Sequence, residues 1–155
     1  QPGAIVATTQ APWYVWLRTR VSETVLGWAT LYEDIDWQPI PTSAWRPGWT
    51  DLEVGGVGAS GWNRHNGRVE VYIRATYSGD PVTAGSTGGN ISDIPVVDLP
   101  SSARPLKGQA PGAFLASTPG MINISVAGLV SITHLFPGGT LDTNTVLTYT
   151  DNWRR

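Results

Sequence analysis

Tryptophan is the residue type in this sequence best suited to contact a ligand, because the chain carries eight of them among its 155 residues. An indole ring can stack on the C–H face of a sugar, and the same ring can anchor a protein interface or fill a core. Trp45, Trp49 and Trp62 stand close to turn residues, so we expect them at the surface. The sequence therefore predicts a saccharide contact at these three positions, with burial in a core or a subunit interface as the alternative.

A small polar group follows Trp62. Arg64 and His65 stand next to Asn66 and Gly67, a pair that is typical of a two-residue hairpin turn. Arginine offers a planar fork of donors that can bind hydroxyl groups or a phosphate. We therefore add Arg64 and His65 to the predicted ligand site, while an ordinary solvated hairpin tip explains the same residues without a ligand.

Patterns for catalysis or metal binding are not visible in the sequence. The chain has no cysteine and two histidines, His65 and His134, and it lacks a nucleophile elbow, a phosphate-binding loop and a paired-histidine motif. The acidic group of Glu33, Asp34 and Asp36 lacks the spacing of a calcium loop, so we expect a solvated strand edge there. Glycoside hydrolysis, which needs two carboxylates, stays formally open. We expect a protein that is not an enzyme and that has no catalytic residues, metal or cofactor.

These side chains must be positioned by β-strands. Over residues 69–77, Val, Val, Ile, Ala and Tyr alternate with Glu, Tyr, Arg and Thr, which is the period of a half-buried strand. The Asn-Gly pair predicts a hairpin of 59–65 with 68–77, and a similar pattern predicts a second hairpin over 121–135. Further strands are expected over 4–9, 13–20, 24–32 and 144–150. Since no segment has helical periodicity, the sequence predicts an all-β fold, an antiparallel β-sandwich or jelly roll of about ten short strands.

Charge and hydropathy count against two classes of protein. Hydrophobic residues make up 41% of the chain and charged residues 14%, with a net charge of −2. With so little charge, part of the polar surface must be Ser, Thr and Asn, or part of the surface must be covered by another subunit. The basic residues form no cluster apart from the terminal Arg154 and Arg155, so we discount a nucleic-acid binder. No apolar stretch approaches the roughly 18 residues of a membrane span, so we expect no membrane insertion.

Two pairs of similar sequences suggest an internal duplication. Residues 15–18 (Val-Trp-Leu-Arg) resemble 71–74 (Val-Tyr-Ile-Arg), and residues 40–47 resemble 99–105. Both pairs follow in the same order at nearly the same spacing. We therefore predict either two related β units, 1–48 and 49–155, or one compact domain in which the likeness is a coincidence.

Residues 48–153 resemble a known family. Residues 49–52 read Trp-Thr-Asp-Leu, the Asn-Gly hairpin and the Val/Tyr/Ile/Arg strand follow, and 99–105 read Leu-Pro-Ser-Ser-Ala-Arg-Pro. This order resembles the C-terminal β-sandwich of receptor-binding and minor tail proteins of tailed phages, of the type that infects Gram-positive hosts. The resemblance implies a homotrimeric, non-catalytic attachment domain at the tail tip or fibre of a virion, which contacts other virion proteins and recognises a saccharide of the host cell surface.

Two other functions are compatible with the same scaffold. The chain could be a structural virion component, a capsid decoration protein or fibre that binds only other virion proteins. It could also be a carbohydrate-binding module of a larger enzyme. Binding to cells favours the attachment domain, binding to assembled shells favours the decoration protein, and a monomer that binds a soluble polysaccharide favours the module.

Overall fold

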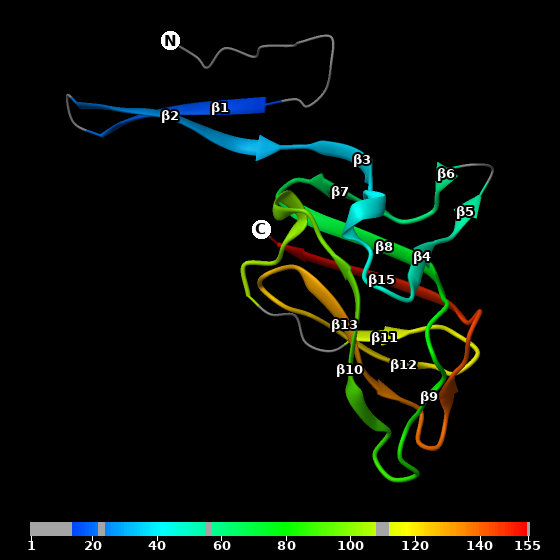
Figure 1. Cartoon of the computed structure of the whole chain (residues 1–155). Coiled ribbons are helices and arrows are strands. Elements are labelled where there is room, and N and C mark those ends of the chain that lie inside the picture. The colour runs from blue at the N-terminus through cyan, green and yellow to red at the C-terminus, as the bar shows by residue number, and fades with distance from the viewer. Residues whose placement is uncertain (1–13, 22–23, 55–56, 108–111, 155) are drawn as a thin grey trace.

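The computed structural model describes residues 14–21, 24–54, 57–107 and 112–154, with side chains from residue 34 onward except 54 and 57. Nine strands build its two main sheets: β3 (Ile35–Pro39), β4 (Trp49–Asp51), β7 (Gly61–His65), β8 (Arg68–Tyr77), β10 (Asn90–Asp98), β11 (Gly112–Phe114), β12 (Gly120–Ile124), β13 (Leu129–Leu135) and β15 (Val146–Arg154). The first sheet has the order β15-β8-β7-β3, with β4 also paired to β8, and the second has the order β10-β13-β12-β11 (Figure 1). The pairings are antiparallel. The predicted all-β sandwich is confirmed.

The remaining strands are short or stand apart from the two sheets. β5 (Glu53–Val54) pairs with β6 (Val57–Gly58), and β9 (Val82–Thr83) pairs with β14 (Thr140–Leu141). β1 (Tyr14–Val21) and β2 (Thr24–Glu33) pair only with each other among the described strands, and their hairpin runs away from the two sheets in Figure 1. The predicted strands over 13–20 and 24–32 are thus confirmed, whereas the one over 4–9 lies outside the described residues. No described helix has the length and apolar character that crossing a membrane requires.

The hairpin of β7 and β8 forms where the sequence predicts it. Asn66 and Gly67 connect the strands with φ angles of 51° and 70°, so both occupy the left-handed region that a type I′ turn requires. Along β8 buried and accessible side chains alternate, and Val69, Val71 and Ile73 are at most 1% exposed. The second predicted hairpin is also present, as β12 and β13.

The core lies between the two sheets and is almost wholly apolar. The first sheet contributes residues of β7, β8 and β15, and the second contributes residues of β10, β12 and β13, because every second residue of each strand faces inward. The largest fully buried side chains are Tyr149, Phe114, Ile73, Leu99, Ile122, Ile124, Ile132, Leu141, Leu147, Val69, Val71 and Val96.

β3 and β10 are among the strands that were not expected from the sequence, and both contain proline. Pro39 ends β3, and Pro95 lies inside β10, where proline normally argues against a strand. Both strands lie at the edge of their sheet, and edge strands tolerate proline because one side of the strand needs no hydrogen-bond donors. The pairing of β10 with β13 is irregular between Pro95 and Val97.

A buried polar cluster marks the point where β8 changes partner. β8 pairs with β7 as far as Tyr72 and with β4 from Ala75 onward. Between them, the backbone N–H of Arg74 donates to the hydroxyl of Ser60 (2.8 Å), which in turn donates to Oδ1 of Asp51 (2.7 Å). Ser60 is fully buried. Its hydroxyl therefore supplies the hydrogen bond that a neighbouring strand provides elsewhere.

The repeated sequence over 40–47 and 99–105 folds the same way twice. Pro41 and Pro100 precede 3₁₀ turns η1 (Thr42–Ala44) and η2 (Ser101–Ala103), with φ, ψ of −66°, 146° and −60°, 153°. Ile40 and Leu99, which precede the prolines, are both buried in the core. The likeness of the two segments is thus structural as well as sequential. The division into units 1–48 and 49–155 stays a prediction.

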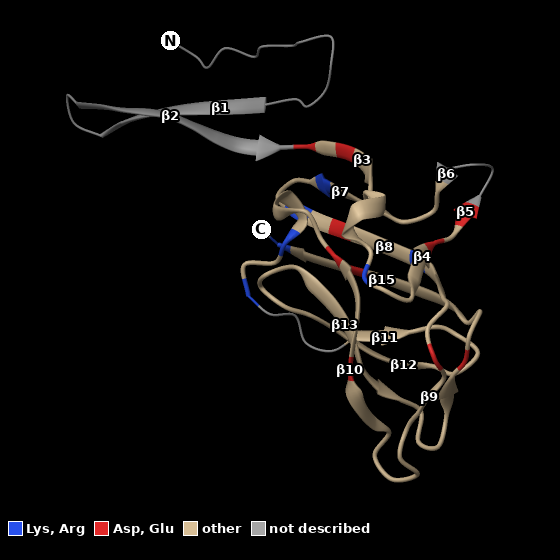
Figure 2. Ribbon diagram, viewed as in Figure 1, with Lys and Arg blue, Asp and Glu red and all other residues tan. Residues whose placement is uncertain are grey.

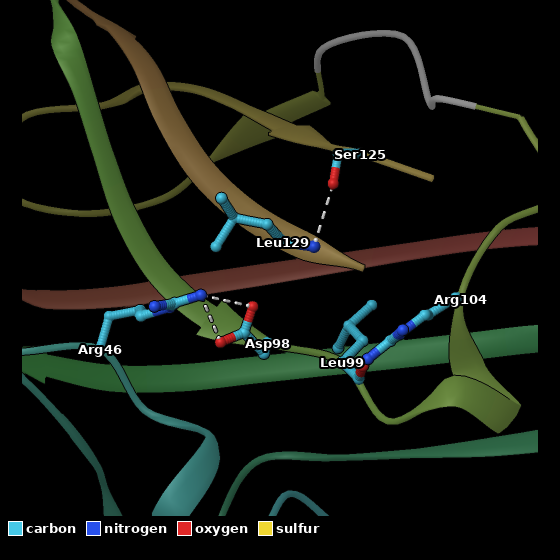
Figure 3. Close-up of polar contacts among 6 residues, drawn as sticks. All are labelled: Arg46, Asp98, Leu99, Arg104, Ser125 and Leu129. Carbon is cyan, nitrogen blue, oxygen red and sulfur yellow. Dashed lines mark hydrogen bonds and ion pairs between the residues drawn. The ribbon is translucent and has the colours of Figure 1, made fainter. Parts of the chain in front are cut away.

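Polar contacts close the sandwich beside these turns (Figure 3). Arg46, from the loop after η1, forms an ion pair of 2.8 Å with Asp98 at the end of β10, and so links the two sheets. Arg104 donates from Nε to the carbonyl of Leu99 (3.0 Å). Each guanidinium group thus connects the segment after a 3₁₀ turn to the end of β10, Arg46 after η1 and Arg104 after η2.

Candidate functional site

The outward side of the first sheet presents three rows of paired residues on β7, β8 and β15. This surface is called the outer face below. The register defines its rows as Gly61, Tyr72 and Thr150, then Asn63, Glu70 and Asn152, and then His65, Arg68 and Arg154. Except for Gly61, these residues are partly or fully exposed. Since they alternate with the buried residues of the same strands, the fold itself turns them outward.

Trp37 covers one end of the outer face. It lies on β3 and is 46% exposed, although indole is the largest side chain. A Cβ atom built on Gly61 would lie 2.4 Å from Cε2 and from Cζ2 of Trp37, so the ring rests on the outward side of this glycine. Gly61 stands directly opposite Tyr72. The first row therefore joins a large exposed aromatic surface to a tyrosine and a threonine.

A cavity occupies the other end of the outer face. Its volume is about 340 Å³, and it is lined by His65, Asn66, Arg68, Glu70 and Arg154. This volume lies at the lower end of the range typical of small-molecule sites. Its walls combine nitrogen donors with one carboxylate acceptor, the pairing that sugar hydroxyl groups or a charged substituent require.

Hydrogen bonds hold the cavity walls in place. Arg68 donates from Nε to Oδ1 of Asn152 (2.8 Å), which fixes its guanidinium across the β8–β15 pair. Asp34 accepts from the backbone N–H of Asn66 (2.9 Å), and its Oδ2 lies 3.8 Å from Nδ1 of His65. The turn at the end of the cavity is thus tied to the residue that precedes β3.

The middle row contains an acceptor that has no partner in the part of the chain that the structure describes. Among the described residues, the side-chain oxygen of Asn63 is buried and receives no hydrogen bond. Buried polar atoms are normally paired.

Blue segments in Figure 2 show Lys and Arg near the C-terminal end of the chain, where Arg68 and Arg154 line the cavity.

The predicted residues near the hairpin do not gather into one site. His65 lines the cavity. Trp62 and Arg64 alternate with the outward residues of β7, so their Cβ atoms lie on the opposite side of the sheet. Trp62 is paired with Val71 and is 4% exposed. The expected exposure of Trp62 is wrong, because in a two-residue hairpin this position faces the inward residues of β8.

Trp45 and Trp49 do come together, at a second cavity of about 400 Å³ whose lining also includes Arg46, Asp51 and Glu53. Trp49 is 5% exposed and packs on Tyr77 with ring centroids 4.9 Å apart. The expected exposure of Trp49 is therefore wrong as well, and Trp45 is partly buried. Within the described part of the chain, the indole N–H groups of both residues are buried and lack an acceptor.

Sequence reasoning missed Trp37, the most exposed tryptophan whose side chain is described. The reason is that the sequence did not predict β3, the strand that carries Trp37. The pairing of β3 with β7 has an irregularity between Ile35 and Gln38. One signal was available. Asp36-Trp37-Gln38 places an aromatic ring between two polar residues, a context that is unusual for a core position.

Metal-ligating side chains do not gather in the described ranges. These ranges contain no group of three or more His, Cys, Asp or Glu residues that could hold a metal ion.

Burial and the neighbouring Asp151 raise the pKa of Tyr149, whose hydroxyl donates to that carboxylate (2.8 Å). Burial also raises the pKa of Tyr77, with Asp80 as a smaller cause. Neither tyrosine belongs to the outer face.

Comparisons with protein-family models, with curated proteins and with solved structures find no match to the chain.

Proposed function

We propose that this chain is a non-catalytic attachment domain of a phage tail tip or fibre, which binds a host cell-surface saccharide through its outer face. The observation that carries the saccharide part is the position of Trp37, a ring 46% exposed that rests on Gly61 beside outward polar residues. The phage part depends on the resemblance of residues 48–153 to receptor-binding and minor tail proteins.

The chemistry of the outer face suits a sugar. The face of an indole ring is electron-rich and attracts the weakly positive C–H groups of a pyranose. Tyr72, Glu70 and Asn152 follow on the neighbouring strands and can exchange hydrogen bonds with hydroxyl groups. A surface of this kind binds weakly at each copy, so a homotrimer attached to other virion proteins would gain its useful affinity through avidity.

The test is adsorption to cells and to purified wall polysaccharide. Trp37→Ala should lower the affinity by roughly thirtyfold, which corresponds to about 2 kcal/mol. Phe136→Ala is the matched control, because Phe136 is also an aromatic residue, 64% exposed, in the loop after β13. Equal binding by the wild type and Trp37→Ala, or no binding to any cell or glycan, contradicts the proposal.

A second candidate is a structural virion component that binds only other virion proteins. Large apolar side chains are strongly exposed at Leu106, Leu115 and Phe136, by 71%, 72% and 64%, and exposed apolar groups favour protein contacts. Binding to assembled capsids or tails, with none to cells, would support this candidate. A monomer that binds a soluble polysaccharide would instead indicate a carbohydrate-binding module of an enzyme.

A further inference from the structure

We infer that the outer face takes a stretch of several sugar rings of a linear oligosaccharide, laid along β8, and not a single terminal sugar. The inference rests on the proposed saccharide function and adds the size and direction of the ligand. It follows from the separation and the different chemistry of the two ends of the outer face.

The two ends are too far apart for one ring to reach both. The first row contains Tyr72 and the third contains Arg68, four residues away on the same strand. A strand rises by about 3.3 Å per residue, so these rows are about 13 Å apart. A single pyranose placed on Trp37 therefore cannot contact the residues of the third row.

The ends also offer different interactions. At the first row, Trp37 provides an exposed ring that suits stacking, beside the uncharged side chains of Tyr72 and Thr150. At the third row, His65, Arg68 and Arg154 provide donors around a cavity of about 340 Å³. One ligand that uses both ends must present a sugar face at one point and polar groups at another, as successive rings of an oligosaccharide do.

The middle row connects the two ends. Glu70, which also lines the cavity, and Asn152 are exposed in this row, and the buried side-chain oxygen of Asn63 has no hydrogen-bond partner among the described residues. The three positions are paired across the strands, so they form a polar row that lies between the first row and the third. A ring that lies over this row can use hydroxyl groups on both of its edges.

The experiment measures affinity against ligand length by calorimetry. The probes are size-fractionated mono-, di-, tri- and tetrasaccharides from a partial hydrolysate of the wall polysaccharide of cells that adsorb the protein. The affinity should rise by about tenfold or more, or about 1.4 kcal/mol, from one ring to three. Equal affinity for the monosaccharide and the trisaccharide would overturn the inference and leave the proposed function standing. Absence of binding by every fraction and by the intact polysaccharide would overturn both.

Two variants separate the ends. Trp37→Ala should weaken binding of every fraction, whereas Arg154→Ala should weaken only the fractions long enough to reach the cavity. Because the two positions are more than about 10 Å apart, their effects on the longest ligand should multiply. Lys107→Ala removes an exposed positive charge from the loop after η2 and serves as the charge control. An equal loss by Arg154→Ala with the shortest ligand would contradict the two-ended arrangement.

Discussion

The indole ring of Trp37 lies against the outward side of Gly61, so close that a Cβ atom on this glycine would be 2.4 Å from two ring carbons and 2.7 Å from the carbonyl oxygen of Gln38. The ring thus lies beside the backbone of Gly61. The side chain of Trp37 is nevertheless 46% exposed. This position of the Trp37 ring requires a residue without a side chain at position 61.

Gly61→Ala should therefore displace Trp37. The added methyl group overlaps both the ring and the carbonyl of Gln38, and overpacking of this kind costs about 1–3 kcal/mol. Saccharide affinity should fall along with stability, since the ring leaves its position. Tryptophan fluorescence and glycan binding report the two effects. Gly85→Ala is the control, because the nearest atom to a Cβ there is 3.8 Å away. Unchanged fluorescence and binding in Gly61→Ala would show that the ring does not depend on residue 61.

Trp62→Ala should destabilise the fold. Trp62 is 4% exposed in the core, and removal of a buried tryptophan costs about 3–5 kcal/mol. Urea unfolding should show this loss, whereas Trp37→Ala should lose much less because its ring is 46% exposed. A loss of binding in Trp62→Ala therefore says nothing about a ligand unless the variant is shown to be folded. Similar urea midpoints for both variants would place Trp62 outside the core.

Ser60→Ala should weaken the point where β8 changes partner. The change leaves the backbone N–H of Arg74 without its acceptor and removes the hydroxyl donor to Asp51, which keeps the backbone N–H of residue 60 as a donor. A buried group left unpaired costs about 1–3 kcal/mol. Hydrogen exchange should accelerate most at Arg74. Ser43→Ala, at an exposed position of η1, is the control and should change stability by less than about 0.5 kcal/mol. Uniform exchange across β8 would contradict a local role.

Stability should decline at alkaline pH because of Tyr149. Burial and Asp151 raise the pKa of this tyrosine above its ordinary value of 10. The folded protein therefore keeps the proton at pH values where the unfolded chain has released it, so the free energy of unfolding falls as the pH rises above about 10. Urea midpoints between pH 8 and pH 11 measure the decline.

Tyr149→Phe should flatten this decline, leaving the smaller part that follows from the raised pKa of Tyr77. At neutral pH the variant should lose about 1 kcal/mol, because the hydrogen bond to Asp151 disappears. An equally steep decline in Tyr149→Phe would assign the pH dependence to other groups.

The fold could be predicted largely because its central strands follow a simple period. The alternation over 69–77 and the Asn66–Gly67 pair fix β7 and β8, and both are present as predicted. The last strand was predicted over 144–150, whereas β15 runs from Val146 to Arg154. β3 and β10 were missed because proline at an edge strand cannot be told from proline in a loop until the sheet order is known.

The candidate site could be predicted only in part. The hairpin register places position 62 opposite position 71, so the burial of Trp62 could have been inferred from the pattern already identified in β8. Nearness to a turn was the weaker signal. The position of Trp37 could not be inferred in this way, because the pairing of β3 with β7 is irregular before Gln38. An irregularity of this kind shifts the phase of the inward and outward alternation, and the five residues of β3 are too few to define that phase from the sequence.

The type I′ turn between β7 and β8 restricts how this surface can evolve. The outward residues of β7 and β8 lie on strands joined by two residues, with no long loop between them that could lengthen or shorten. One inserted residue in β8 would exchange the core side chains with the solvent side chains beyond that point. Related chains with other targets should therefore differ by replacement of individual outward residues, with strand lengths conserved between them.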